Sequence, residues 1–148
     1  WSLRTADSGT ARNINSIACF KGKIIAGADD GEIIIAEEKG PGIKIKLPLK
    51  GNIVSLSAGA PECYGVTDKG EIIHSADGIT WDILDFNQVY SGYYKQCFFK
   101  RILASENSIV VTGVRDDGSP VPLFLAYGNA WTEWNLFYTD DEGAPGFL

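Results

Sequence analysis

The feature that most constrains the fold is a unit of short β-strands that recurs along the chain with an acidic turn at its centre. Gly31-Glu32-Ile33 recurs as Gly70-Glu71-Ile72, 39 residues later, and Gly118 of a third acidic turn follows after 48 more. Each unit is predicted to contain four strands, with an Asp-x-Gly turn between the second and third. Repeats of roughly 40–50 residues with four short strands are typical of β-propeller blades. We therefore expect an all-β, β-propeller-like chain of about three four-stranded antiparallel blades, with little helix.

Three tryptophans occupy the same position in successive repeats. Trp1, Trp81 and Trp131 each lie 16 residues before a residue of the next predicted first strand. The chain is therefore expected to begin on the last strand of one blade and to end where another blade would start. Within one all-β domain, residues 1–148, we expect repeats at approximately 13–51, 52–95 and 96–138, with partial blade strands at 1–5 and 146–148.

Three blades are fewer than the roughly four to eight of a closed propeller. We therefore expect either a segment of a larger propeller or copies that self-associate through their end strands, which would cover exposed sheet edges. The absence of Met, with Trp1 as the first residue, agrees with an excised or processed piece. A sandwich or barrel of unrelated hairpins is the alternative, because the number of strands alone also fits it.

The most specific motif is Ser75-Ala76-Asp77-Gly78-Ile79-Thr80-Trp81, between two β-like runs. Asp-Gly between such runs predicts a hairpin bend, because Gly accepts a positive φ. The segment resembles the Asp-box, or BNR repeat, of sialidase-like and photosystem-assembly-factor-like propellers. The resemblance implies a structural bend on the rim, away from the central site, with structural roles for five residues. They are Ser75, Asp77, Gly78, Thr80 and Trp81.

An enzyme is the first alternative that the resemblance brings, because sialidases carry Asp-boxes. They resemble one another in an arginine cluster for the substrate carboxylate and a Tyr–Glu nucleophile pair. The four arginines of this chain, Arg4, Arg12, Arg101 and Arg115, are spread over different repeats. Acidic pairs in the Asp-x-Gly turns are explained by turn formation. We therefore predict no catalytic residue, and retain a fragment of a sialidase-like glycan-processing enzyme as the alternative.

Aromatic loops are the best candidates for ligand or partner contacts. Aromatic faces with polar groups suit sugar rings or peptides, although packing between blades also uses aromatic residues. The predicted function is thus a non-enzymatic binding or scaffold module with a protein or carbohydrate partner, and a lectin-like carbohydrate-binding domain is a further alternative. The predicted contact residues are Tyr90, Tyr93, Tyr94, Tyr127 and Trp134.

Net charge and composition limit the classes of partner that the sequence predicts. The net charge of −6 and the pI near 4.7 weigh against nucleic acid as a partner. No apolar run approaches the roughly 20 residues of a spanning helix, so no membrane span is expected. We find no cofactor motif. The compartment is left open by composition, whereas the resemblance favours an extracellular or cell-surface location.

Metal and thiol chemistry receive no support from the spacing of ligands. His74 is the single histidine, and no C-x-x-C pair exists, so a zinc site is not expected. The acidic turns lack EF-hand spacing and are interpreted as solvated turns rather than calcium loops. Cys19, Cys63 and Cys97 have apolar or aromatic neighbours and are predicted to be buried thiols. One disulfide with one free thiol is the alternative.

Overall fold

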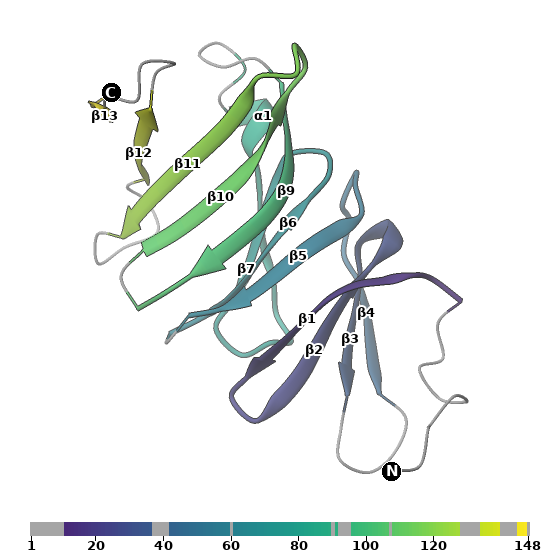
Figure 1. The fold of residues 1–148 in the computed structure, drawn as a ribbon. Coiled ribbons are helices and arrows are strands. Elements are labelled where there is room, and N and C mark those ends of the chain that lie inside the picture. Colours follow the sequence, from purple (N-terminus) through teal and green to yellow (C-terminus); the bar gives the residue numbers. More distant parts are fainter. Residues whose placement is uncertain are drawn as a thin grey trace.

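The computed structural model of the chain consists of three antiparallel β-sheets that follow one another in a row (Figure 1). From residue 121 onward, the structure describes only the backbone. Alternating and short apolar runs separated by Gly-containing turns explain why the chain forms strands rather than helices. The described residues are 11–36, 42–59, 61–89, 91, 96–106, 108–127, 134–139 and 145–147.

The first sheet has the strand order β1-β2-β3-β4. A 3-10 turn, Asp29–Gly31, joins the second strand to the third, as the acidic pattern predicts. Asp30 and Gly31 both have positive φ there. The strands are β1 (Ile14–Phe20), β2 (Lys23–Ala28), β3 (Glu32–Ala36) and β4 (Ile43–Lys46).

The second sheet repeats this order as β5-β6-β7-β8 and is followed by a single turn of helix, α1 (Phe86–Val89). The sequence predicts a loop from Asn87 onward, so this short helix is a correction. Asp85 explains it, because its carboxylate accepts a hydrogen bond from the Gln88 amide at 3.0 Å and caps the turn. The strands are β5 (Ile53–Ala58), β6 (Cys63–Thr67), β7 (Glu71–Ser75) and β8 (Asp82–Asp85).

The third sheet has five strands rather than the expected four, in the order β13-β12-β11-β10-β9. The strand expected at 146–148 does form, but β13 pairs with β12 of the same sheet instead of starting another. Pairing there satisfies the edge of β12. The strand expected at 1–5 lies outside the described residues. The strands are β9 (Cys97–Ala104), β10 (Ser108–Arg115), β11 (Pro120–Tyr127), β12 (Trp134–Thr139) and β13 (Pro145–Phe147).

The same backbone hydrogen bond closes each sheet at the acidic turn. The amide of the first turn residue donates to the carbonyl of a residue just before the first strand. The first and second sheets also share a bulge at the start of their first strand, at Ile14/Ser16 and Ile53/Ser55. The 39-residue spacing is therefore a structural equivalence. The three bonds are Asp29 N to Asn13 O at 3.1 Å, Asp68 N to Asn52 O at 3.1 Å, and Asp116 N to Gln96 O at 3.0 Å.

The first and second sheets pack face to face through one apolar cluster. The first sheet supplies Ile25, Ile33 and Ile35, and the second supplies Ile53 and Leu56, all buried. Burial of such side chains contributes roughly 1.5–3 kcal/mol each. Between the first strands of the two sheets, the Leu56 amide donates to Ser16 Oγ at 2.8 Å.

The second and third sheets meet in the same way. Tyr64 and Phe86 of the second sheet and its helix share one buried cluster with Phe99 of the third, and the two Phe rings lie edge to face with centroids 5.6 Å apart. The Ile102 amide of β9 donates to Ser55 Oγ of β5 at 3.2 Å, which repeats the Ser16 contact one sheet further along. β1, β5 and β9 are therefore successive first strands in one row.

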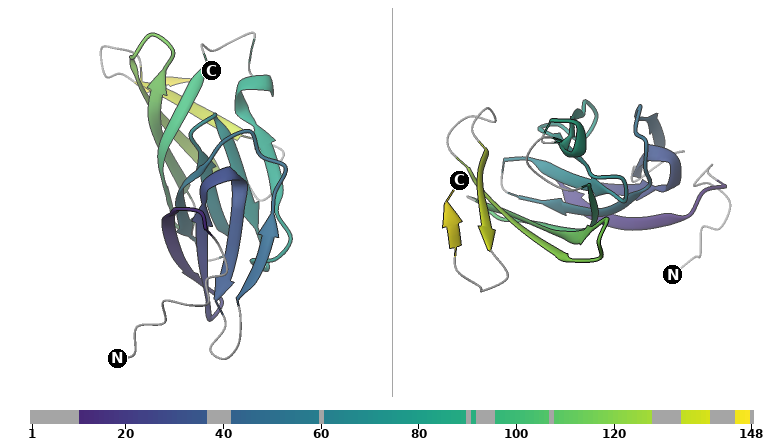
Figure 2. Two further views of the ribbon diagram at one scale, coloured as in Figure 1. Left: turned by 90° about the vertical axis from the view of Figure 1, so that its right-hand side faces the viewer. Right: turned by 90° about the horizontal axis from the view of Figure 1, so that it is seen from above.

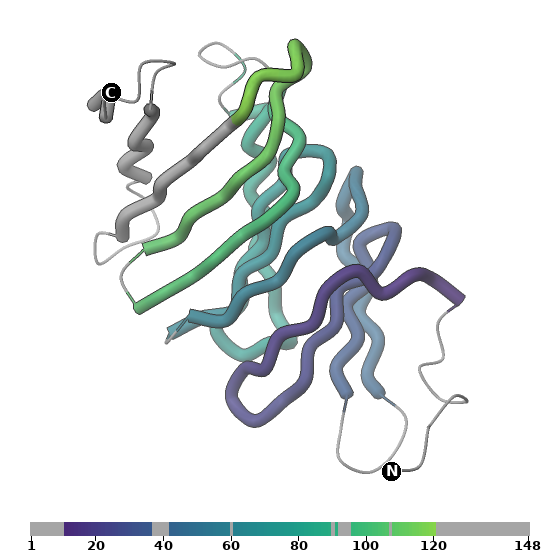
Figure 3. The backbone as a smooth tube through the Cα atoms, in the orientation of Figure 1, coloured from purple at the N-terminus to yellow at the C-terminus, as the bar shows by residue number. Residues whose placement is uncertain are grey.

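The row of sheets is open. Figure 2 shows the first and third sheets at opposite ends, and the tube in Figure 3 passes from one sheet to the next in chain order. The described residues do not form a closed ring. Cys63 and Cys97 are buried as predicted, but Cys19 is exposed, which corrects the prediction. Cys19 lies on β1, beside the exposed Ile24 to which it is paired, on the face that the second sheet does not cover.

Candidate functional site

The Ser75–Trp81 bend, residues 75–81 between β7 and β8, is held by its own side chains. Ser75 Oγ accepts from the Gly78 amide at 2.7 Å and donates to Asp77 Oδ1 at 3.0 Å. Asp77 Oδ1 also accepts from the amides of Ile79 and Thr80, each at 2.7 Å. These backbone hydrogen bonds lower the pKa of Asp77 to about 2, because they favour the ionised carboxylate.

The same bend packs against the turn between β1 and β2 of the first sheet. Lys21 and Lys23 donate from Nζ to the carbonyls of Ala76 and Asp77, at 2.6 and 3.0 Å. Trp81 is buried in the cluster between the two sheets, and its Nε1 donates to the Gly78 carbonyl at 3.3 Å. Every contact described for the bend is thus made within the chain.

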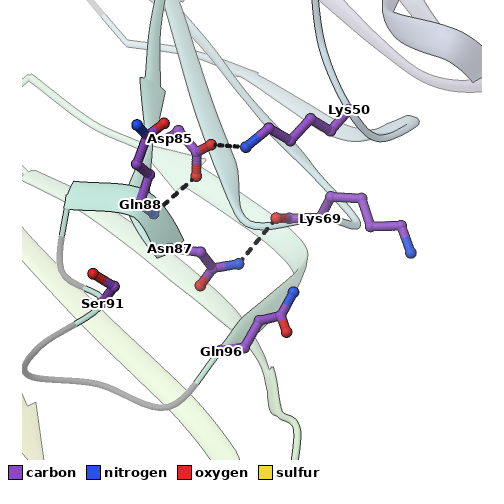
Figure 4. A pocket seen from close by; sticks show the side chains of 7 residues that line it. All are labelled: Lys50, Lys69, Asp85, Asn87, Gln88, Ser91 and Gln96. Atoms are coloured by element: carbon purple, nitrogen blue, oxygen red, sulfur yellow. Dashed lines mark hydrogen bonds and ion pairs between the residues drawn. The ribbon is translucent and has the colours of Figure 1, made fainter.

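A polar cleft of about 530 Å³ lies at the opposite end of the sheets. Figure 4 shows its lining side chains, which come from separate segments around the junction of the second and third sheets. They belong to the β4–β5 connection, the β6–β7 turn, the end of β8, α1, and the segment that leads to β9. The lining residues of this polar cleft are Lys50, Lys69, Asp85, Asn87, Gln88, Ser91 and Gln96.

Asn87 fixes one wall of the polar cleft. Its Nδ2 donates to the carbonyls of Lys69 and Cys97, at 3.0 and 2.8 Å, and its Oδ1 accepts from the Cys97 amide at 2.8 Å. One amide side chain thereby ties the β6–β7 turn to the start of β9. Because its polar atoms are used in this way, Asn87 positions the cleft rather than offering it new hydrogen bonds.

Glu71 holds the part of the polar cleft that contains Lys50. This buried carboxylate accepts from the amides of Lys50 and Gly51, at 2.9 and 3.2 Å, and from Thr67 Oγ1 at 2.8 Å. Buried carboxylates are stable only with such partners. Glu71 therefore holds the connection that carries Lys50 against the β6–β7 turn.

One ion pair dominates the electrostatics of the polar cleft. The Lys50 ammonium contacts the Asp85 carboxylate, and their hydrogen bond raises the pKa of Lys50. Burial opposes ionisation of Asp85, but the hydrogen bonds from Lys50 and the Gln88 amide outweigh it and lower the pKa of Asp85. Lys69 adds a second positive charge, so the lining is net positive in a chain of net charge −6.

Of the five aromatic residues predicted to make contacts, two belong to described strands. Tyr90, Tyr93 and Tyr94 lie outside the described residues, but their neighbours Ser91 and Gln96 line the polar cleft. Tyr127 and Trp134 are opposite one another in the β11–β12 pair. That pair lies beside the start of β10, whereas the end of β10 pairs with Cys97 next to the cleft.

The arginines and the histidine also lie apart among the described residues. Arg12 forms ion pairs with Asp30 and Glu32 of the first sheet. Arg101 and Arg115 lie on the third sheet, opposite Thr112 and Cys97 respectively. No arginine cluster forms from these three, and Arg4 lies outside the described residues.

His74 is a strand residue of β7, with its Nδ1 3.0 Å from Glu62 Oε2. Within the described part of the chain, no group of three His, Cys, Asp or Glu residues is placed to hold a metal ion. No helix in that part is long and apolar enough to cross a membrane.

Sequence reasoning missed the polar cleft, because its residues come from segments far apart in the chain. A signal was nevertheless present. In a sheet with strand order one to four, the turn between the second and third strands lies at the same end as the connection to the next sheet. The turn that contains Lys69 and the connections that contain Lys50 and Gln96 are therefore expected to meet.

No protein-family model matches this chain, and no similar sequence was found among curated proteins. Its function is therefore inferred from the geometry of the polar cleft and of the repeated sheets.

Proposed function

We propose that this chain is a non-enzymatic binding module built on propeller-type repeats, and that the polar cleft is its ligand site. The single observation that carries this proposal is a cleft of about 530 Å³ whose lining residues, within the described part of the chain, all have polar side chains. Ligand sites usually combine a concave surface with a few placed polar groups. The repeated closing bond and the shared bulge support the propeller-type architecture.

The lining favours a ligand rich in hydroxyl groups, such as a carbohydrate. Gln88, Gln96 and Ser91 offer amide and hydroxyl groups that both donate and accept hydrogen bonds, and Lys69 offers a cation. The Lys50–Asp85 pair is already neutralised internally. Tyr90, Tyr93 and Tyr94 are neighbours in sequence of the lining residues Ser91 and Gln96, and aromatic faces suit the apolar faces of sugar rings.

The test is an NMR titration of the full chain with a panel of neutral and acidic mono- and oligosaccharides. The amide signals of Lys69, Gln88, Ser91 and Gln96 are expected to shift together for a binding sugar. Replacing Gln96 by Ala removes one side chain with donor and acceptor atoms and is expected to weaken binding by about 2- to 10-fold, from roughly 0.5–1.5 kcal/mol per hydrogen bond.

Glu106→Ala is the matched control, because Glu106 is exposed at the other end of β9. It is expected to leave the affinity unchanged. Signal shifts that cluster away from the polar cleft, or equal weakening by Gln96→Ala and Glu106→Ala, would contradict the proposal.

A further inference from the structure

Among the described residues, the first sheet has one apolar face that neither of the other two sheets covers. Strand alternation places Ile17 on the opposite side from Ala18, which packs against the second sheet. Ile17 pairs with Ala26, and Cys19 pairs with Ile24, so these side chains share one face. We call it the open face: Ile14, Ile17, Cys19 and Ile24, which are exposed, and Ala26 and Ile34, which are buried.

The 39-residue equivalence identifies the positions of the second sheet that correspond to the open face of the first sheet. The row Ile17–Ala26–Ile34 corresponds to Leu56–Gly65–Ile73 of the second sheet, pair by pair. In the second sheet these positions pack against the first sheet. Three equivalent pairs differ in exposure: Ile14 is 44% exposed and Ile53 0%, Ile17 is 62% and Leu56 7%, and Ile24 is 49% and Cys63 0%.

The third sheet has the complementary uncovered face at the other end of the row. Leu103 is 69% exposed and pairs with Val110, on the side of β9 and β10 opposite the buried Ile102 and Ile109. The Ile102 amide donates to Ser55 Oγ of β5 as the Leu56 amide donates to Ser16 Oγ of β1, so Leu103 corresponds to Ser57. Ser57 Oγ accepts from the Ala104 amide of the next sheet at 3.0 Å. Leu103 therefore lies on the face that contacts a following sheet.

We infer that the open face of the first sheet binds the outer face of the third sheet of a second copy of this chain. The chain already forms this kind of contact twice, between its first and second and its second and third sheets. Two copies related by a two-fold axis would bring six sheets, and six falls within the roughly four to eight of closed propellers. Both uncovered faces would then be buried. This contact involves a different surface from the polar cleft and does not depend on its ligand.

A cysteine pair tests the contact directly. In the contact between the second and third sheets, Ser57 faces Ala104. Cys19 of the first sheet is the equivalent of Ala104, and Leu103 of the third sheet is the equivalent of Ser57. In the inferred contact, Cys19 of one copy should therefore face Leu103 of the other. Leu103→Cys with the native, exposed Cys19 is expected to give a disulfide-linked dimer under mild oxidation. The product is read on a non-reducing gel.

Two variants control this experiment. Leu103→Cys combined with Cys19→Ser is expected to lose the dimer, because Cys63 and Cys97 are buried. Ile79→Cys, at an exposed position of the Ser75–Trp81 bend, is expected to give none. Absence of a linked dimer with Leu103→Cys, or a ladder of longer polymers instead of a dimer, would overturn the inference.

Sedimentation velocity provides a second readout without cross-linking. The chain is expected to sediment at twice its 16.0 kDa mass, and Ile17→Glu is expected to sediment as a folded monomer. Ile17 is exposed within one copy, so a charge there should leave the circular dichroism spectrum unchanged. Val89→Glu, at an exposed position of α1, should remain dimeric. A wild-type monomer, or an Ile17→Glu dimer, would overturn the inference.

Discussion

The first and second sheets contain the same residue pattern in different surroundings. Ile14 and Ile53 are equivalent positions 39 residues apart, both occupied by isoleucine, yet one is half-exposed and the other fully buried. The closing backbone hydrogen bond and the bulge occur at equivalent positions in both sheets. Burial in this molecule is therefore decided by the neighbouring sheet rather than by the strand itself.

The largest expected effect comes from this isoleucine pair. Ile53→Ala leaves a cavity between the sheets and should lower the free energy of unfolding by about 2–5 kcal/mol. Ile14→Ala removes a side chain that is 44% exposed and should lower it by less than about 1 kcal/mol. Urea denaturation at a concentration where the chain is monomeric measures both. Equal losses would contradict the comparison.

A second pair compares the acidic residues that follow the turns. Glu71→Ala leaves the amides of Lys50 and Gly51 without their acceptor and should cost about 2–3 kcal/mol. Its equivalent Glu32 lies 3.6 Å from Arg12, and its buried Oε1 has no hydrogen-bond partner in the described part of the chain, so Glu32→Ala should cost less than about 1 kcal/mol. The same denaturation experiment reads both variants. A larger loss of unfolding free energy for Glu32→Ala than for Glu71→Ala would contradict the role of Glu71 in holding the β4–β5 connection.

Two turn glycines, Gly78 and Gly118, are expected to differ less in the stability that their replacement costs. Gly78 has φ of +80°, and an added Cβ would lie 2.8 Å from Ile25 Cδ1 of the first sheet. Gly118 has φ of +81°, with no heavy atom of the described chain within 4 Å of an added Cβ. Gly78→Ala should cost about 1–2 kcal/mol and Gly118→Ala about 1 kcal/mol, since only the first adds a clash to the strain. Thermal unfolding distinguishes the two, and a larger loss at Gly118 would contradict the packing of the bend.

The smallest effect is a pH dependence at the Ser75–Trp81 bend. The pKa of Asp77 is about 2 in the folded chain and 3.8 in its ordinary state. A lowered pKa contributes stability above about pH 4, which is lost as the pH falls from about 4 to 2. Asp77→Asn should therefore flatten the decline of the melting temperature over this range, and Asp82→Asn, at an exposed strand position, is the control. An unchanged slope in Asp77→Asn would contradict the role of its hydrogen bonds.

The strands and acidic turns could be predicted from the sequence because both depend on local patterns. Asp-x-Gly turns need a positive φ that Gly supplies, and the runs between them have strand periodicity. The helix α1 was missed because it depends on Asp85 accepting from Gln88, a single capping contact. The exposure of Cys19 was missed for another reason. Its apolar neighbours predict burial, but it lies on the face of the first sheet that the second sheet does not cover.

The polar cleft could not be predicted from the sequence. The sequence predicts contacts at Tyr90, Tyr93 and Tyr94, which stays a prediction, whereas the cleft is lined by other residues that include Ser91 and Gln96. Lys50, Lys69 and Asp85 were not identified, because nothing in their local sequence distinguishes them from other surface charges. They become neighbours only when the second and third sheets pack together.

Amide hydrogen exchange, followed by mass spectrometry over a range of chain concentrations, tests most directly whether neighbouring sheets decide burial. β6 is already covered within one copy, so its exchange should be slow and independent of concentration. β2, its equivalent on the open face, should exchange faster at low concentration and approach the protection of β6 as the dimer forms. Exchange of β2 that does not change with concentration would contradict this account.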